Sequence, residues 1–177
     1  SRVQITLGSQ AVLTVFQTLQ SSGFSNNAMD LALDAGSKLH LFDVQLLPEK
    51  TRSFFALRAT LKRDAHLQAM HATDGSEAVR CSASIELAEE NSSAHFRALA
   101  MLTNGRQAHV HAFVDHAAPY TNSRQHVKMA LNGQSRSSFE GKIFVRPIAQ
   151  KTEAYQLNNN LLLSDQAAAH AKPDRKS

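Results

Sequence analysis

Several residue types and motifs are scarce in this sequence, and each shortage narrows what the chain can be. Cys81 is the only cysteine, which excludes an intrachain disulfide and fits a reducing compartment. No apolar run approaches the roughly 20 residues that a membrane span needs. Walker-type phosphate loops, Rossmann glycine patterns and Gly-x-Ser-x-Gly elements are missing. We therefore expect no membrane span and no nucleotide binding, so that any ATP hydrolysis would belong to a partner.

The charge of the chain is mild and dispersed along the sequence. Its 177 residues suit one domain with a sizeable core, and 19 Lys and Arg against 15 Asp and Glu give a formal net charge of +4. Nucleic-acid binding usually needs a clustered basic face with aromatic side chains for stacking. The basic residues are scattered apart from the tail at 172–177, and the nine Phe fall mostly in apolar segments. We expect a solvated basic surface and no nucleic-acid partner.

A weak internal repeat organises the chain. Short segments in which apolar and polar residues alternate are separated by polar turns, and this period of two is typical of strands with one inward face. One set of turns recurs roughly every 28 residues, within the range of repeat architectures. A second set lies between them. The first set is centred on Gly8, Gly36 and Asp64, and the second on residues 48–50, 74–76 and 104–106.

Two strands per repeat, stacked repeat upon repeat, predict a parallel β-helix, or solenoid, of about six coils. Each coil would bury its inward aliphatic side chains against those of the next. The residues expected to stack inward at successive levels are Leu13, Leu39, Leu67 and Phe96.

The alternative fold is an antiparallel β-sandwich. Asn104-Gly105 and Asn132-Gly133 are good signals for tight hairpin turns. Turns about a dozen residues apart are also typical of sandwiches. Pattern alone leaves both folds open.

Histidine is the enriched reactive residue, with nine copies. His109 and His111 are two positions apart, which on a strand places both imidazoles on one face and suggests a metal site. His116 follows, and a further ligand could be Asp115 or His126. A bare His-x-His is a weak motif, and polar alternation on a solvent-facing strand gives the same spacing. We favour a structural or surface role for these residues.

Cys81 is the second reactive candidate. It could bind iron or carry sulfur, but a lone cysteine is more often a small buried hydrophobic residue. The neighbouring Arg80 could lower the pKa of a thiol. The alternation, however, predicts that the two side chains point to opposite faces.

Two sequence neighbours, Asp64 with His66 and Asp115 with His116, could be read as acid–base pairs. General acid–base chemistry needs both groups within reach of one substrate. The spacing alone does not indicate this, so we assign no catalytic, cofactor-binding or metal-binding residue.

Residues near the C-terminus carry a resemblance to a known family. The matching pieces are residues 139–145 (FEGKIFV), 149–154 (AQKTEA), Gln156 and 158–165 (NNNLLLSD). Upstream, residues 61–65 (LKRDA) also match. A further pattern comprises His116, Pro119, Thr121, Ser123, Gln125 and Lys128. These residues resemble the SufB/SufD family of scaffold subunits in SUF iron–sulfur cluster assembly, and they lean toward its SufD branch.

The resemblance implies a right-handed β-helix that is non-catalytic and works in a SufB–SufC–SufD complex in the cytoplasm. An iron–sulfur cluster is implied only for the full complex, and no cofactor is expected on this fragment alone. The motif residues are interpreted as coil-stacking positions. Gly141 would allow a tight backbone turn, and the amides of residues 158–160 could bond turn backbone. The family's suggested cluster-associated histidine lies in a segment beyond residue 177, so no cluster ligand is assigned here.

The chain is expected to form one domain followed by a short charged tail. Residues 1–171 would form one β-helix core, and residues 172–177 a charged, disordered tail. The chain opens at Ser1 without a methionine and looks like a truncated core, so its open strand edges could pair with SufB-like and SufC-like subunits or form a homodimer. Two other functions remain open: a carbohydrate-active β-helix enzyme, and a small metal-binding protein that uses His109 and His111.

Overall fold

The chain folds entirely as β-strands and turns. The computed structural model describes residues 1–20 and 22–176, and no helix occurs within those residues. The strands are β1 Arg2–Leu7, β2 Val12–Leu19, β3 Phe24–Leu33, β4 Lys38–Gln45, β5 Arg52–Leu61, β6 His66–Thr73, β7 Ala78–Leu87, β8 Ser93–Leu102, β9 Gln107–His116, β10 Asn122–Leu131, β11 Arg136–Val145, β12 Glu153–Leu162 and β13 Ala168–Lys176.

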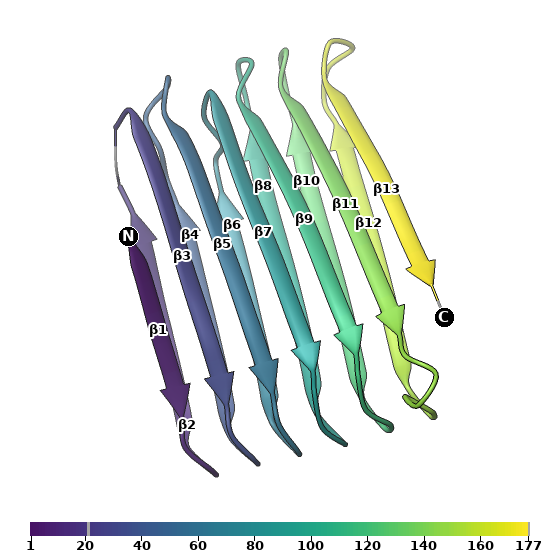
Figure 1. The fold of residues 1–177 in the computed structure, drawn as a ribbon. Coiled ribbons are helices and arrows are strands. Elements are labelled where there is room, and N and C mark those ends of the chain that lie inside the picture. The colour runs from purple at the N-terminus through teal and green to yellow at the C-terminus, as the bar shows by residue number, and fades with distance from the viewer. Residues whose placement is uncertain (21, 177) are drawn as a thin grey trace.

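The strands form two parallel sheets that face each other. The odd-numbered strands make a seven-stranded sheet in sequence order, and the even-numbered strands make a six-stranded sheet. In Figure 1 the front strands run downward, the rear strands run upward, and successive coils advance from left to right. The fold is therefore a right-handed parallel β-helix of about six coils, as predicted.

Alternation along each strand builds the core. Every second residue points inward and pairs with its counterpart in the next coil, so that aliphatic side chains form continuous ladders between the sheets. One such ladder joins Leu33, Leu61 and Leu87, all at most 1% exposed. In the next coil His116 occupies the position that leucine holds in these three strands.

The predicted inward stack is right in part. Leu13 pairs with Leu39, and Leu39 pairs with Leu67. The next residue of this ladder is Ala94, whereas Phe96 pairs with Ala69, one inward position further along. The predicted level of Phe96 was wrong. The coils differ in length, so a fixed period of roughly 28 residues assigns some residues to the wrong level.

The turns separate the two folds that the sequence left open. Asn104-Gly105 connects β8 to β9, and Asn132-Gly133 connects β10 to β11. In each case the two strands belong to different sheets, so neither turn closes an antiparallel hairpin. Asn104 and both glycines have positive φ angles, which Asn and Gly adopt most readily. The antiparallel sandwich is therefore excluded.

The expected boundary at residue 171 does not appear. Strand β13 continues through Lys172 to Lys176, and its residues pair in register with β11 from Arg136 to Phe144. Charged residues can join an outer strand because alternate side chains point to solvent. Residue 177 of the expected tail lies outside the described residues.

Two interpretations of the C-terminal motif also need correction. Gly141 lies within β11 rather than in a turn, and a Cβ atom there would fall 2.1 Å from Nε2 of Gln156 and 2.5 Å from Cζ of Phe139. Close packing, not a tight turn, requires this glycine. Asn158 and its two following asparagines lie within β12, so they are not turn residues.

Candidate functional site

The two histidines of the His-x-His motif share one face, as the sequence predicted. His109 and His111 are both half-buried on the outer side of β9. His109 Nδ1 lies 2.7 Å from Ser138 Oγ, and His111 Nδ1 lies 3.5 Å from Ser82 Oγ. Burial and the nearby Arg80 lower the pKa of His109. Each imidazole is thus engaged by a serine of a neighbouring coil.

The other proposed ligands lie elsewhere. His116 points into the core, where Nδ1 is 2.7 Å from Thr121 Oγ1 and Nε2 is 2.8 Å from Ser123 Oγ. Thr121 Oγ1 also lies 3.1 Å from the Ala118 carbonyl oxygen and 3.2 Å from Thr152 Oγ1, so His116 belongs to a buried polar cluster. His126 lies on the six-stranded sheet. Within residues 1–20 and 22–176, no group of three or more His, Cys, Asp or Glu could hold a metal ion.

Cys81 is fully buried in the core, while Arg80 is exposed. Burial, followed by the negative charge of Asp43, raises the pKa of the Cys81 thiol far above its ordinary value. A buried neutral thiol is a poor nucleophile and a poor metal ligand. The arrangement supports the interpretation of Cys81 as a core residue.

The suggested acid–base pairs are not formed as pairs. Asp64 lies in a turn with a positive φ, while His66 Nδ1 lies 2.7 Å from Ser93 Oγ. Asp115 points outward from β9, and the next residue, His116, points inward. Alternation therefore separates the second pair to opposite faces of the sheet.

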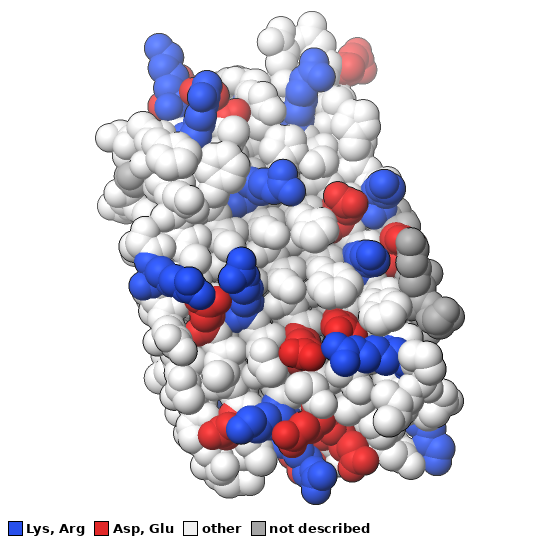
Figure 2. Space-filling view, viewed as in Figure 1, with Lys and Arg blue, Asp and Glu red and all other residues white. Residues whose placement is uncertain are grey.

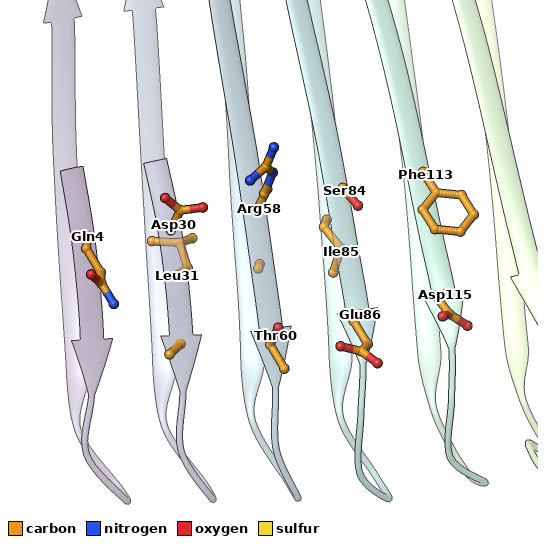
Figure 3. A pocket seen from close by; sticks show the side chains of 12 residues that line it. Gln4, Asp30, Leu31, Arg58, Thr60, Ser84, Ile85, Glu86, Phe113 and Asp115 are labelled. Atoms are coloured by element: carbon orange, nitrogen blue, oxygen red, sulfur yellow. The ribbon is translucent and has the colours of Figure 1, made fainter. Parts of the chain in front are cut away.

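A shallow hollow of about 490 Å³ lies on the outer face of the seven-stranded sheet. Figure 3 shows the side chains of Arg58 and Phe113 beside small residues such as Ser84. Because small side chains alternate with large ones at this level, the face is indented rather than flat. The hollow also contains three carboxylates, those of Asp30, Glu86 and Asp115.

Two of these carboxylates are adjacent across coils. Glu86 pairs in register with Asp115. Arg146 bridges them, with its Nη2 atom 3.2 Å from Glu86 Oε1 and 2.7 Å from Asp115 Oδ2. This contact compensates one of the two negative charges and ties together three successive coils, so the acids belong to an ion-pair network.

A buried polar network inside the solenoid was missed by the sequence analysis. Asp43 and His71 are 1% and 2% exposed, and His71 Nδ1 lies 2.6 Å from Asp43 Oδ2. Asp43 also accepts hydrogen bonds from Gln17 Nε2 at 2.9 Å and Gln45 Nε2 at 3.0 Å. Several donors on one carboxylate are what a buried charge requires.

The network crosses the interior from one sheet to the other. Ser53 on β5 donates to Gln45 Oε1 at 2.9 Å, and Ser25 on β3 donates to Ser53 Oγ at 3.0 Å. His71 stacks on Phe55 with ring centroids 6.2 Å apart, and its Nε2 atom is buried without a hydrogen-bond partner. A signal was present in the sequence: Asp43 and Gln45 occupy inward positions of the alternation in β4.

The sequence of the solenoid matches a known protein family. A family model described as "SUF system FeS cluster assembly, SufBD core domain" matches residues 1–176. The chain belongs to the SufBD core-domain family. The match covers the whole solenoid, so every element described above is part of the family's core.

Curated relatives carry the same designation. An iron–sulfur cluster assembly SufBD family protein of Mycobacterium leprae is 26% identical over 162 residues, which cover 88% of this chain and 41% of that protein. The iron–sulfur cluster assembly protein SufD of Escherichia coli is 32% identical over 99 residues, covering 56% of this chain and 23% of that protein. A SufBD family protein of Synechocystis is 33% identical over 86 residues.

The chain spans about two fifths of the first of these relatives. No helix within the described residues is long and apolar enough to cross a membrane.

Proposed function

We propose that this chain is the β-helix core of a non-catalytic, SufD-like scaffold subunit that works in the cytoplasm in iron–sulfur cluster assembly. The family match over residues 1–176 is the observation that carries the proposal. The long rigid solenoid also supports it, because parallel coils joined by continuous ladders hold distant surfaces at fixed separation. The cluster would be the cargo of the complex rather than a cofactor of this chain.

The edge strands are the surfaces best suited to assembly. β12 and β13 each pair with only one neighbouring strand of this chain, as do β1 and β2 at the other end. An unpaired strand edge offers a row of backbone donors and acceptors to another chain. We propose that the C-terminal edge contacts a SufB-like subunit, and that ATP hydrolysis is supplied by a SufC-like subunit.

The direction of the backbone amides in β12 allows a sharp test. The amides of Glu153 and Leu163 donate to carbonyls of the neighbouring coil. Because consecutive residues of a parallel strand point their amides to alternate sides, the amide of Asn160 points to the free edge. Proline is tolerated on an edge strand where its missing N–H faces away from the sheet. Asn160→Pro should block strand addition and keep the fold.

The experiment is co-expression of the tagged chain with the SufB-like and SufC-like proteins of its source organism, followed by co-purification. We expect a complex, and we expect Asn160→Pro to reduce the SufB-like subunit recovered. Thr14→Pro is the matched control, since its amide faces the free edge of β2 at the opposite end of the solenoid. A chain that recovers neither subunit would contradict the proposed function. Equal loss of the SufB-like subunit with both variants would show that the contact does not depend on the free edge of β12.

A further inference from the structure

The outer face of the six-stranded sheet is strongly asymmetric in charge. Among the described residues, the carboxylate that points outward from these six strands is that of Glu153, at the start of β12, where it accepts a hydrogen bond from Asn122. The cationic and protonatable side chains on the same face are Lys38, His40, His66, His95, Arg97, Arg124, His126 and Lys128.

The opposite face is different. Figure 2 shows acidic and basic side chains intermixed on the seven-stranded sheet. Several are paired, for example Arg2 with Asp30 and Arg146 with Asp115. The ion pairs found among the described residues lie on that sheet, in turns or in the interior, and none lies on the outer face of the six-stranded sheet. Among the described residues, the cations of this face therefore outnumber its carboxylate and form no ion pair with it.

Four of these side chains form a compact cluster, which we call the basic checkerboard. His95 on β8 pairs with Arg124 on β10, and Arg97 on β8 pairs with His126 on β10. Neighbouring strands lie about 4.8 Å apart, so arginine and imidazole groups alternate within contact distance. Like charges at such positions destabilise a sheet unless a counter-charge is present.

The checkerboard has a recess and an unsatisfied polar atom. A small cavity of about 40 Å³ is lined by its four residues, and a larger hollow of about 450 Å³ adjoins it over Arg124, His126 and Tyr155. Nε2 of His126 is buried without a hydrogen-bond partner, and the ring packs edge-on against Tyr155 with centroids 5.6 Å apart. The arrangement combines convergent donors with space beside them.

We propose that the basic checkerboard of His95, Arg97, Arg124 and His126 binds a tetrahedral oxyanion of the phosphate or sulfate type. Two guanidinium groups supply planar forks that suit two oxygens of such an anion. Imidazole N–H groups add donors between them. The bound anion removes the repulsion among the arginines, whereas a divalent cation would add to it. This inference stands independently of the role proposed in cluster assembly.

The electrostatics of the histidines link anion binding to protonation. Burial, followed by nearby cations, lowers the pKa of both His95 and His126. A bound anion opposes these cations and raises both pKa values, so affinity increases as the histidines become protonated. The charged or titratable groups that face the two rings from β6, β8, β10 and β12 are His66, Arg97, Arg124, Lys128, Glu153 and Tyr155.

Sodium sulfate is the suitable probe, because its charge does not change across the histidine range. Sulfate is titrated at constant ionic strength against chloride, with binding followed through the imidazole proton resonances and by calorimetry. We expect saturable shifts of the His95 and His126 resonances. Affinity should rise as the pH falls through and below 6.5, the ordinary pKa of histidine, because the pKa values of His95 and His126 are lowered from it. Inorganic phosphate and ATP, compared at one pH, distinguish a free anion from a nucleotide phosphate.

Charge-matched variants decide the location. Arg97→Gln and Arg124→Gln should each weaken sulfate binding by about tenfold or more, the usual effect of losing a charge-assisted contact. Arg58→Gln removes the same charge from the opposite sheet and should leave affinity unchanged. All three arginines are exposed, so the fold is expected to persist, which circular dichroism checks. Resonance shifts that rise linearly with sulfate concentration and do not saturate would overturn the proposal. An equal loss of sulfate affinity in Arg58→Gln would also overturn it. Binding of an acidic peptide without sulfate or phosphate binding would also overturn it.

Discussion

The Nδ1 atom of His71 lies 2.6 Å from Oδ2 of Asp43, and both side chains are sealed inside the solenoid. Their contact joins β4 to β6, two successive coils of the six-stranded sheet. Gln17, one coil earlier, donates to the same carboxylate. These hydrogen bonds stabilise the enclosed carboxylate, and each donor in turn has the carboxylate as its acceptor.

Removing Asp43 should therefore destabilise the whole fold. Asp43→Ala leaves the buried His71 and Gln45 and the half-buried Gln17 without this acceptor, and losing one member of a buried pair typically costs about 3–5 kcal/mol. Urea unfolding followed by circular dichroism measures the loss. Glu49→Ala, at an exposed turn, should change the free energy of unfolding by less than about 0.5 kcal/mol. Equal effects of the two variants would show that the network contributes no stability.

The stability of the chain should fall on acidification through the histidine range. The folded protein lowers the pKa of His95 and His126 from the ordinary value of 6.5, so below 6.5 the unfolded chain binds more protons. Stability from this source is present above the ordinary pKa and is lost as the pH falls through the folded pKa values. Urea unfolding across this range in chloride buffer tests the sign. The double variant His95→Gln/His126→Gln should weaken this dependence, and the part that remains should include His109, whose pKa is lowered as well.

Gly141 should resist substitution even by alanine. The added Cβ atom would overlap Gln156 Nε2 and the ring of Phe139, and overpacking of this kind typically costs about 1–3 kcal/mol. Gly8→Ala is a matched control, since nothing lies within 4 Å of a Cβ atom there. Thermal and urea unfolding of the two variants give the comparison. Similar stabilities would show that Gln156 moves aside freely.

Cys81 should be unreactive in the folded protein. Its burial and raised pKa deplete the thiolate that reacts with alkylating and disulfide reagents. Modification by a chromogenic disulfide at mildly alkaline pH should be slow, and its rate should rise with urea as the protein unfolds. Rapid reaction without denaturant, at a rate that urea does not change, would contradict the buried position.

The isolated chain should self-associate through its last coil. Leu161, Leu162 and Leu163 are 58%, 50% and 58% exposed at the uncovered edge of the six-stranded sheet. Light scattering across a concentration series should detect a dimer, and the double variant Leu161→Lys/Leu163→Lys should shift it toward monomer. A dimer that persists in the folded variant would place the contact elsewhere, and a strict monomer at high concentration would exclude this association.

The family and the fold class were accessible from the sequence because both rest on local pattern. Alternation and recurring turns indicate two strands per repeat but leave the solenoid and the antiparallel sandwich open, and the resemblance carried by residues 139–165 favours the solenoid. The level of Phe96 was not accessible, since the coils vary in length and a fixed period loses register. The role of Gly141 was also missed, because its partner Gln156 belongs to the next strand, β12.

The family motifs lie in consecutive residues, so the membership in the SufBD core family and the solenoid that it implies could be predicted without three-dimensional information. Which distant residues meet follows from the fold. Basic residues that look dispersed along the chain gather on one sheet, where His95 lies beside Arg124, and Asp43 reaches His71 across a full coil. The physical reason is the stacking of parallel coils: it places residues separated by a whole repeat one strand spacing apart, about 4.8 Å.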